Sequence, residues 1–256
     1  MCFDDDSHPP ISLSANSSAR GEALRITAAD GTRVAAYMAT PGEGARSQVV
    51  ILPDARGLHH FYRELALRFA DVGIRALAFD YFARSAEDDD RSEPFDYRSH
   101  IQLMTPDTFA QDLTAAVDRI RQGDGSSLPT FTVGFCMGGS LSLWAGTRGL
   151  NLAGVIAFYA SLSRSFGAVT PALEWAPRIT SPVLGLFGGA DQGIPRSEVD
   201  QLEDELEEAR IPHEIIVYPD APHSFFDRKA AEFATESADA WARVQGFIGR
   251  YEPVRV

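Results

Sequence analysis

Short apolar runs alternate with amphipathic stretches over most of this chain, and this alternation constrains the possible folds more than any other feature. The apolar runs begin near residues 47, 74, 129, 152, 181 and 213. Most are followed by a stretch with apolar residues at helical spacing, such as residues 61–73 and 197–210. We expect the stretch over residues 229–251 to form the terminal helix. Strands separated by helices pair in parallel, and parallel sheets are covered on both faces. We therefore predict an α/β fold with a mainly parallel central sheet and helices on both faces.

The N-terminal region follows a different pattern. Residues 23–41 contain two β-like runs around Asp30-Gly31, a strong signal for a hairpin turn, so we expect an antiparallel N-terminal hairpin at the edge of the sheet. Residues 1–20 are rich in Ser, Asp, Asn and Pro. Their apolar residues follow neither the period of two that is typical of strands nor the period of 3.6 that is typical of helices. We predict a disordered or mobile tail over residues 1–20 and a single domain over residues 21–256, with no internal repeat or linker.

Composition excludes several classes of protein. The 256 residues are 45% hydrophobic, which is enough to bury a core without disulfides or metals. A formal net charge of −13 argues against nucleic acid or an anionic membrane as a partner. The two cysteines, Cys2 and Cys136, form no disulfide framework, and no signal peptide or membrane span is evident. We expect a cytoplasmic monomer or small homo-oligomer with no cofactor.

The segment TFTVGFCMGGSLSLWAG, residues 130–146, carries the strongest chemical signal. Cys136 occupies the centre of a Gly-x-Cys-x-Gly pattern between a strand and a helix, with Gly134 and Gly138 at its flanks. This is the nucleophile-elbow pattern with a thiol in place of the serine hydroxyl, and the glycines permit a strained turn between closely packed backbones. A helix N-terminus lowers the pKa of a thiol and binds an oxyanion. The alternative is a buried, inert cysteine.

A base and an acid for such a thiol are expected at later strand ends. Asp191 follows one apolar run in a glycine-rich turn, and His223 follows the next run. The chain order of nucleophile, acid and histidine is that of α/β-hydrolases, so we predict this fold. Asp191 also suits an ordinary turn, and Asp220 is a rival acid. The remaining histidines fit surface or capping positions better than a catalytic or metal site: His8, His59, His60, His100 and His213.

These motifs resemble the dienelactone hydrolase family, a cysteine-nucleophile branch of the α/β-hydrolases. The resemblance covers roughly residues 23–251 and rests on VGFCMGG, FGGADQGIP and APHSFFD, with LPDARGL and FDYFAR after the two preceding strands. It implies that Cys136 is the nucleophile, His223 the general base and Asp191 its orienting acid. It also implies an oxyanion hole formed by the backbone N–H groups of Met137 and Ala55.

The resemblance also suggests residues that hold the substrate or tune the thiol. Asp54 stands where well-known members carry a glutamate beside the cysteine, and is one methylene shorter. Arg84 matches the first of two arginines that hold the carboxylate of dienelactone, although it also suits a surface ion pair. At the second arginine position stands Asp227, with Arg228 one place later. Arg56 is a further candidate cation.

A polar loop over residues 85–104 is expected to border the site and shape its specificity. Its apolar residues either line a pocket or simply pack: Phe95, Tyr97 and Met104.

The sequence therefore predicts a hydrolase of a small ester or lactone that acts through a Cys-His-Asp triad and a thioester acyl-enzyme. Two other interpretations remain open. One is a class I glutamine amidotransferase, in which a glutamate follows the histidine as His-x-Glu, whereas Ser224 and Phe225 follow His223 here. The other is a non-hydrolytic member of the same fold, either a ligand-binding protein or a cyclase-like biosynthetic enzyme.

Overall fold

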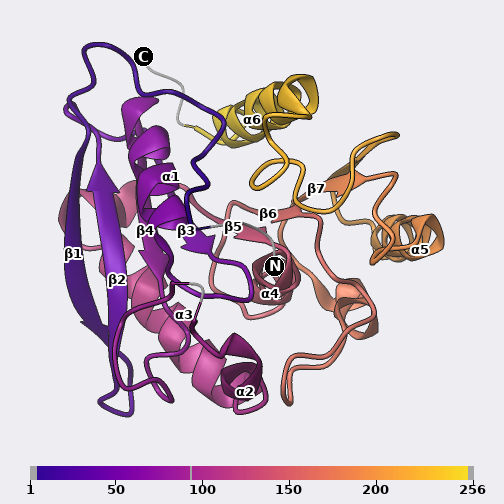
Figure 1. The fold of residues 1–256 in the computed structure, drawn as a ribbon, viewed down its shortest axis with the longest axis horizontal. Coiled ribbons are helices and arrows are strands. Elements are labelled where there is room, and N and C mark those ends of the chain that lie inside the picture. The colour runs from indigo at the N-terminus through magenta and orange to yellow at the C-terminus, as the bar shows by residue number, and fades with distance from the viewer. Residues whose placement is uncertain (1–4, 93, 253–256) are drawn as a thin grey trace.

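A single eight-stranded sheet organises the molecule (Figure 1). The computed structural model describes residues 5–92 and 94–252. The strands lie in the order β1-β2-β4-β3-β5-β6-β7-β8. Their bounds are β1 (Arg20–Thr27), β2 (Arg33–Thr40), β3 (Ser47–Leu52), β4 (Ile74–Phe79), β5 (Thr130–Phe135), β6 (Gly154–Phe158), β7 (Val183–Gly188) and β8 (His213–Tyr218).

The predicted hairpin and the predicted parallel sheet are both confirmed. β1 pairs antiparallel with β2 from Arg20 opposite Thr40 to Thr27 opposite Arg33, which leaves Asp30-Gly31 in the turn. β2 pairs antiparallel with β4, and all later neighbours pair in parallel. The carboxyl ends of the six parallel strands, β3 to β8, therefore meet at one edge of the sheet.

Within the described residues, six α-helices surround the sheet. They are α1 (His60–Asp71), α2 (Tyr97–Ile101), α3 (Pro106–Ile120), α4 (Met137–Ala145), α5 (Arg196–Glu208) and α6 (Ala234–Gly249), with short 3-10 helices at Gly123–Ser127, Ala172–Glu174 and Ala176–Arg178. Among the described residues, none of these helices has the length and apolar character needed to cross a bilayer.

Neighbouring residues of β5 show which helices lie on which face. The ring of Phe131 packs against α6 at Phe247, with centroids 6.1 Å apart, whereas Thr132 Oγ1 lies 2.8 Å from Ser142 Oγ on α4. Successive side chains of a strand point to opposite faces, so α6 and α4 cover opposite faces of the sheet. α1 contacts α6 through Phe69 and Trp241. α3 contacts α4 on the other face, through Phe109 and Trp144.

The structure differs from the sequence-based prediction in two segments. The last helix, expected from residue 229, begins at Ala234, because residues 224–233 form successive tight turns closed by bonds such as Ala230 N–H to Asp227 O. The polar loop over residues 85–104 contains the short helix α2. Residues 5–19 contain no helix or strand, and residues 1–4 of the predicted tail, with Cys2, lie outside the described residues.

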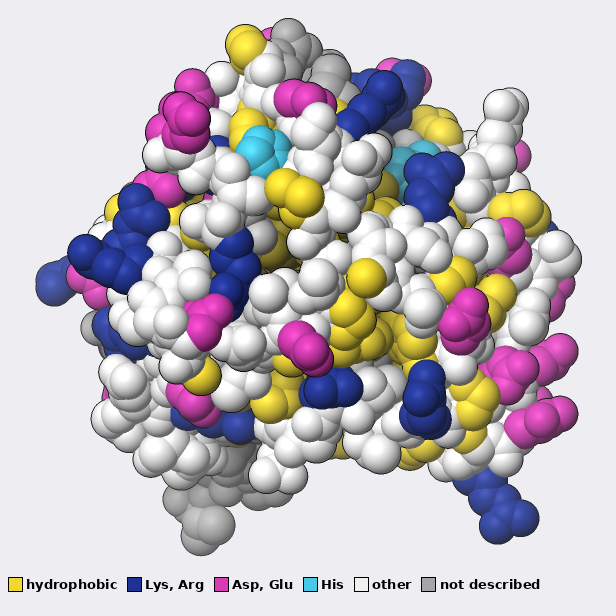
Figure 2. All heavy atoms as spheres, turned by 90° about the horizontal axis from the view of Figure 1, so that it is seen from below, with side chains coloured by type: hydrophobic (Ala, Val, Ile, Leu, Met, Phe, Trp, Pro, Cys, Tyr) yellow, Lys and Arg dark blue, Asp and Glu magenta, His cyan; other side chains and the backbone are white. Residues whose placement is uncertain are grey.

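The excess of acidic residues is not concentrated on the underside of the molecule. Figure 2 shows Lys and Arg side chains interspersed with Asp and Glu on this face, around a hollow with apolar side chains on its floor. Because charges of both signs are mixed on this face, its electrostatic potential is neither uniformly negative nor uniformly positive.

Because the turn at Cys136 packs closely against the end of β3, we expect alanine substitutions at two glycines to have opposite effects on the free energy of unfolding. A Cβ at Gly138 would overlap the backbone oxygens of Leu52 and Pro53, whereas one at Gly246 in α6 meets nothing within 4 Å. We expect Gly138→Ala to lower the free energy of unfolding by about 3 kcal/mol, as overpacking does. Gly246→Ala should raise it by roughly 0.5–1 kcal/mol through helix propensity. Urea unfolding of both variants checks this, and equal effects would contradict it.

Candidate active site

Cys136 lies in the sharp turn between β5 and α4. Its backbone has φ 55° and ψ −114°, a conformation that residues other than glycine rarely adopt. The turn is held from one side by a hydrogen bond from Cys136 N–H to Phe158 O of β6, at 3.0 Å. A Cβ at Gly134 would overlap the carbonyl group of Gly138, so the flanking glycines are needed where they stand. The thiol consequently stands at the N-terminus of α4.

Asp191 and His223 are brought together from the ends of β7 and β8. His223 Nδ1 lies 2.6 Å from Asp191 Oδ2, while Asp191 Oδ1 accepts a hydrogen bond from Gly193 N–H at 2.8 Å. The Asp191 side chain is 2% exposed and that of His223 is 30% exposed. A buried carboxylate that accepts a hydrogen bond from Nδ1 fixes the orientation of the imidazole ring. It also selects the neutral tautomer that has its proton on Nδ1, which leaves Nε2 able to accept a proton. The rival acid, Asp220, is exposed.

Two cavities meet at Cys136. The larger, of about 590 Å³, extends towards α2 and the loop after β3, and the smaller, of about 420 Å³, extends towards the loop after β7. Five residues line both: Cys136, Ser161, Arg164, His223 and Arg228. Among the described residues that line either cavity, His223 is the sole histidine. The site therefore has room for a substituent on each side of the thiol.

Of the two predicted oxyanion donors, Ala55 lines the larger cavity and Met137 directly follows Cys136 in the chain. Met137 is the first residue of α4, where a backbone N–H has no acceptor within its own helix. Ala55 lines the larger cavity, and within the described part of the chain its N–H donates no backbone hydrogen bond. Two N–H groups that bond to no backbone acceptor within residues 5–92 and 94–252 suit a developing oxyanion.

Asp54 and Arg56 both line the larger cavity and are both buried. Asp54 Oδ1 accepts a hydrogen bond from the backbone N–H of Arg56 at 2.9 Å, which tightens the turn that carries Ala55. The Arg56 guanidinium donates to Asp5 Oδ1 at 2.6 Å and to Arg91 O at 2.8 Å. It is therefore already held by groups of this chain.

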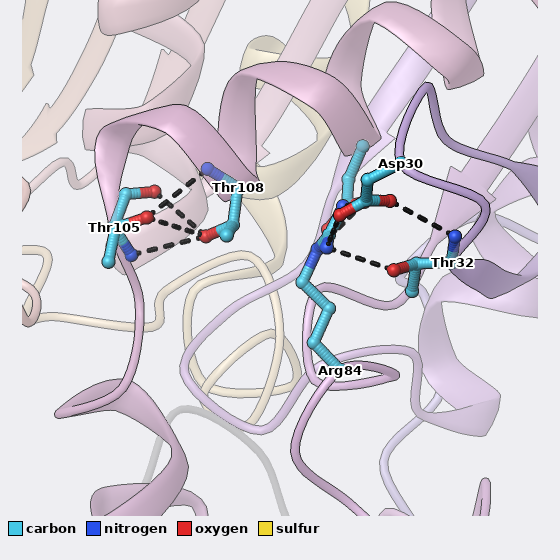
Figure 3. A network of polar contacts seen from close by, with 6 residues as sticks. Asp30, Thr32, Arg84, Thr105 and Thr108 are labelled. Carbon is cyan, nitrogen blue, oxygen red and sulfur yellow. Dashed lines mark hydrogen bonds and ion pairs between the residues drawn. The ribbon is translucent and has the colours of Figure 1, made fainter.

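The expectation that Arg84 holds substrate needs correction. Its guanidinium bonds with Asp30 and with Thr32 Oγ1, the latter at 2.9 Å (Figure 3), and also with Asp112. Arg84 does not line either cavity at Cys136. These carboxylates raise the pKa of Arg84, with the hydrogen bond to Asp112 as the largest cause. In turn Arg84 lowers the pKa of Asp30. Arg84 therefore joins the hairpin turn to α3, as its alternative interpretation proposed.

Arg228 lies at the site although it stands one place later than in the family pattern. It lines both cavities, whereas the preceding Asp227 is buried. Tyr159 Oη lies 2.7 Å from Asp227 Oδ2, and the backbone N–H of Arg228 donates to Asp227 Oδ1. Burial raises the pKa of Asp227 to about 8; the hydrogen bond from Tyr159 opposes this shift and the charge of Asp54 adds to it.

Two arginines of the site were missed by the sequence reasoning. Arg98 on α2 and Arg164 in the loop after β6 line the larger cavity, and Arg164 lines the smaller one as well. Neither belongs to a motif, so no local signal pointed to them. Of the loop aromatics, Tyr97 lines the larger cavity, while Phe95 stacks on His100 and Met104 lines a separate depression.

Comparison with known proteins agrees with this geometry. The family model for the dienelactone hydrolase family matches residues 34–252. A putative carboxymethylenebutenolidase of Methylorubrum extorquens is 31% identical over 248 residues, which cover 94% of this chain and 84% of the relative. One of Escherichia coli K12 is 27% identical over 227 residues, covering 86% of this chain and 84% of the relative.

A solved structure gives the same result. The crystal structure of a putative dienelactone hydrolase from Klebsiella pneumoniae has a TM-score of 0.79 and 26% identity, covering 91% of this chain and all of the other. The fold and the elbow define an α/β-hydrolase. Within that class, the chain belongs to the dienelactone hydrolase family, and it is an ester hydrolase.

The buried Asp227 makes stability depend on pH in a defined direction. Its pKa is about 8 in the folded protein and about 3.9 in an unfolded chain. Between these values the folded protein retains a proton that the unfolded chain has released, so this group lowers the free energy of unfolding as pH rises from about 4 to about 8. Asp227→Asn should remove this dependence on pH. As pH rises from about 4 to about 8, the free energy of unfolding of the variant should therefore rise relative to that of wild type by up to about 1.4 kcal/mol per pH unit.

Urea unfolding at pH 5, 6.5 and 8 measures the slope. Asp220→Asn, at an exposed turn position, is the control for loss of a carboxylate and should show no comparable trend. Parallel stability curves for Asp227→Asn and wild type would contradict the expected ionisation.

Proposed function

We propose that the protein hydrolyses small esters or lactones through Cys136, His223 and Asp191 and a thioester acyl-enzyme. The observation that carries this proposal is the hydrogen bond of 2.6 Å between His223 and the buried Asp191, next to cavities lined by both His223 and Cys136. The strained backbone of Cys136 and its place at the N-terminus of α4 add support, because both are features of a nucleophile elbow.

The first half of the reaction forms the acyl-enzyme. His223 accepts the proton of the Cys136 thiol and becomes an imidazolium. The resulting thiolate attacks the carbonyl carbon, and the carbonyl oxygen takes the negative charge between the N–H groups of Met137 and Ala55. When the tetrahedral intermediate collapses, the bond to the leaving oxygen breaks and His223 donates a proton to it. An alcohol leaves, or the ring of a lactone opens, and a thioester remains on Cys136.

Hydrolysis completes the cycle. His223 accepts a proton from a water molecule, whose oxygen attacks the thioester carbonyl, and the thiolate is expelled with release of the carboxylic acid. Asp191 stabilises the imidazolium in both halves. A thiolate is a better leaving group than an amine, so amides would tend to return to starting material. Activated esters and lactones are therefore the expected substrates.

Three arginines support an anionic group on the substrate. Arg98, Arg164 and Arg228 line the larger cavity, and within the described part of the chain none of them forms a salt bridge. The chain contains 36 acidic and 23 basic residues, so acid partners are plentiful elsewhere. Guanidinium groups without an acid partner beside a nucleophile suit a carboxylate, which they bind in bidentate geometry.

The nucleophile assignment is tested with p-nitrophenyl acetate and a panel of small lactones. In a Cys2→Ser background, Cys136→Ala should lower kcat by at least about a thousandfold, the scale of losing a catalytic nucleophile. Thermal melting of both proteins controls for folding. Equal turnover with and without the Cys136 thiol would reject the assignment.

The role of the arginines is tested by comparing mono-p-nitrophenyl succinate with p-nitrophenyl butyrate, an ester of similar length without the charge. We expect Arg164→Gln and Arg228→Gln each to lower kcat/KM for the succinate ester by roughly tenfold, since a charge-assisted hydrogen bond contributes about 1.5–3 kcal/mol and the site is open to solvent. The butyrate ester should change less than twofold.

Arg178→Gln is the matched control for these variants, because Arg178 is exposed and lines neither cavity. If kcat/KM falls equally for both esters in the Arg164 and Arg228 variants, the arginines do not recognise a substrate anion.

A further inference from the structure

The irregular N-terminal segment follows one face of α1. We call residues 5–14 the strap. Its contacts fall on α1 residues spaced by four, four and three positions, which share one helical face. The pairs are Ser7 O with His60 Nε2 at 2.9 Å, His8 Nδ1 with Glu64 Oε2 at 2.9 Å, Ile11 O with Arg68 Nε at 2.6 Å and Ser14 N with Asp71 Oδ2 at 2.8 Å.

The first described residue of the strap reaches the loop that follows β3. Asp5 Oδ1 accepts hydrogen bonds from Arg56 Nη2 at 2.6 Å and from His59 Nε2 at 3.1 Å. The side chains of Arg56 and His59 are 1% and 4% exposed. Burial lowers the pKa of His59 to about 4, so at neutral pH the uncharged ring donates its Nε2 proton. Burying a guanidinium is costly unless it is paired, and the Asp5 carboxylate provides such a partner.

The loop held in this way carries the proposed oxyanion donor. On one side of Ala55, Tyr62 Oη accepts from Asp54 N–H at 3.0 Å. Tyr81 Oη donates to Pro53 O and also lies 3.0 Å from Asp54 O. On the other side of Ala55 stands Arg56, whose side chain is bound by the strap. A backbone N–H that stabilises an oxyanion must be held within about 0.5 Å of its productive position. Anchors on both flanking residues restrict the peptide between them.

We propose that Asp5 is a positioning residue for the reaction: through Arg56, the strap holds the Ala55 N–H where the oxyanion develops. This inference rests on the proposed function, since it requires Ala55 to serve as an oxyanion donor. The family model begins at residue 34, so the strap lies outside the segment that it matches. Loss of the Asp5 carboxylate should therefore impair the chemical step without removing the nucleophile.

The test compares Asp5→Ala with wild type on p-nitrophenyl butyrate. We expect kcat to fall by roughly five- to twentyfold with KM within twofold, because one oxyanion donor is loosened and not removed. Alkylation of Cys136 by iodoacetamide develops no oxyanion, so its rate should stay within twofold of wild type, in a Cys2→Ser background. Asp5→Glu should recover at least half of the lost kcat.

The neighbouring Asp6→Ala is the matched control, because Asp6 is exposed and makes no hydrogen bond within the described residues. It should behave as wild type. An unchanged kcat in Asp5→Ala, or a parallel loss of kcat and of the alkylation rate, would overturn the positioning role. Failure of the proposed function is separate: it would appear as equal turnover by wild type and Cys136→Ala.

Discussion

The turn between β5 and α4 holds Cys136 in a strained backbone conformation, with φ 55° and ψ −114°. A single residue in such a conformation costs of order 1–3 kcal/mol, so the surrounding structure must enforce it. The enforcement is close packing: Gly134 lies against the Gly138 carbonyl, and Gly138 lies against the end of β3. The same approach brings Ala55, which follows β3, near the N-terminus of α4. The same packing therefore positions both the thiol and the proposed oxyanion donors.

Buried charge lies around the loop after β3 and is balanced locally. Arg91 and Asp80 form a pair in which both side chains are nearly inaccessible, at 1% and 2% exposure, and Asp80 also accepts from Leu58 N–H in the loop after β3. Arg56 is bound to Asp5 and to the Arg91 carbonyl. Buried ion pairs add little net stability, but breaking one is expensive. They therefore fix the loop conformation more than they stabilise the fold, which suits a site that must be rigid before substrate arrives.

Features set by residues close together in the chain could be predicted from the sequence, whereas contacts between distant residues could not. The hairpin at Asp30-Gly31 and the elbow at Cys136 were readable because local backbone geometry demands particular residues. The start of α6 was placed five residues early, because the turns over residues 224–233 have apolar residues that also fit a helix. Arg84 was assigned to the substrate by position in a motif, and its actual partners, Asp30 and Asp112, are 54 and 28 residues away in the chain.

The sequence by itself determined the alternation of strands and helices, the parallel sheet and the order of Cys136, Asp191 and His223 at strand ends. These follow from periodicity and turn chemistry, which act within a few residues. Only the tertiary structure decided which of the arginines line the cavity at the thiol: Arg98, Arg164 and Arg228 do so in addition to Arg56, while Arg84 is bound to Asp30 and Asp112. The reason is that a long, flexible side chain takes its partner from whatever the packed elements bring near it, and chain position alone carries no such information.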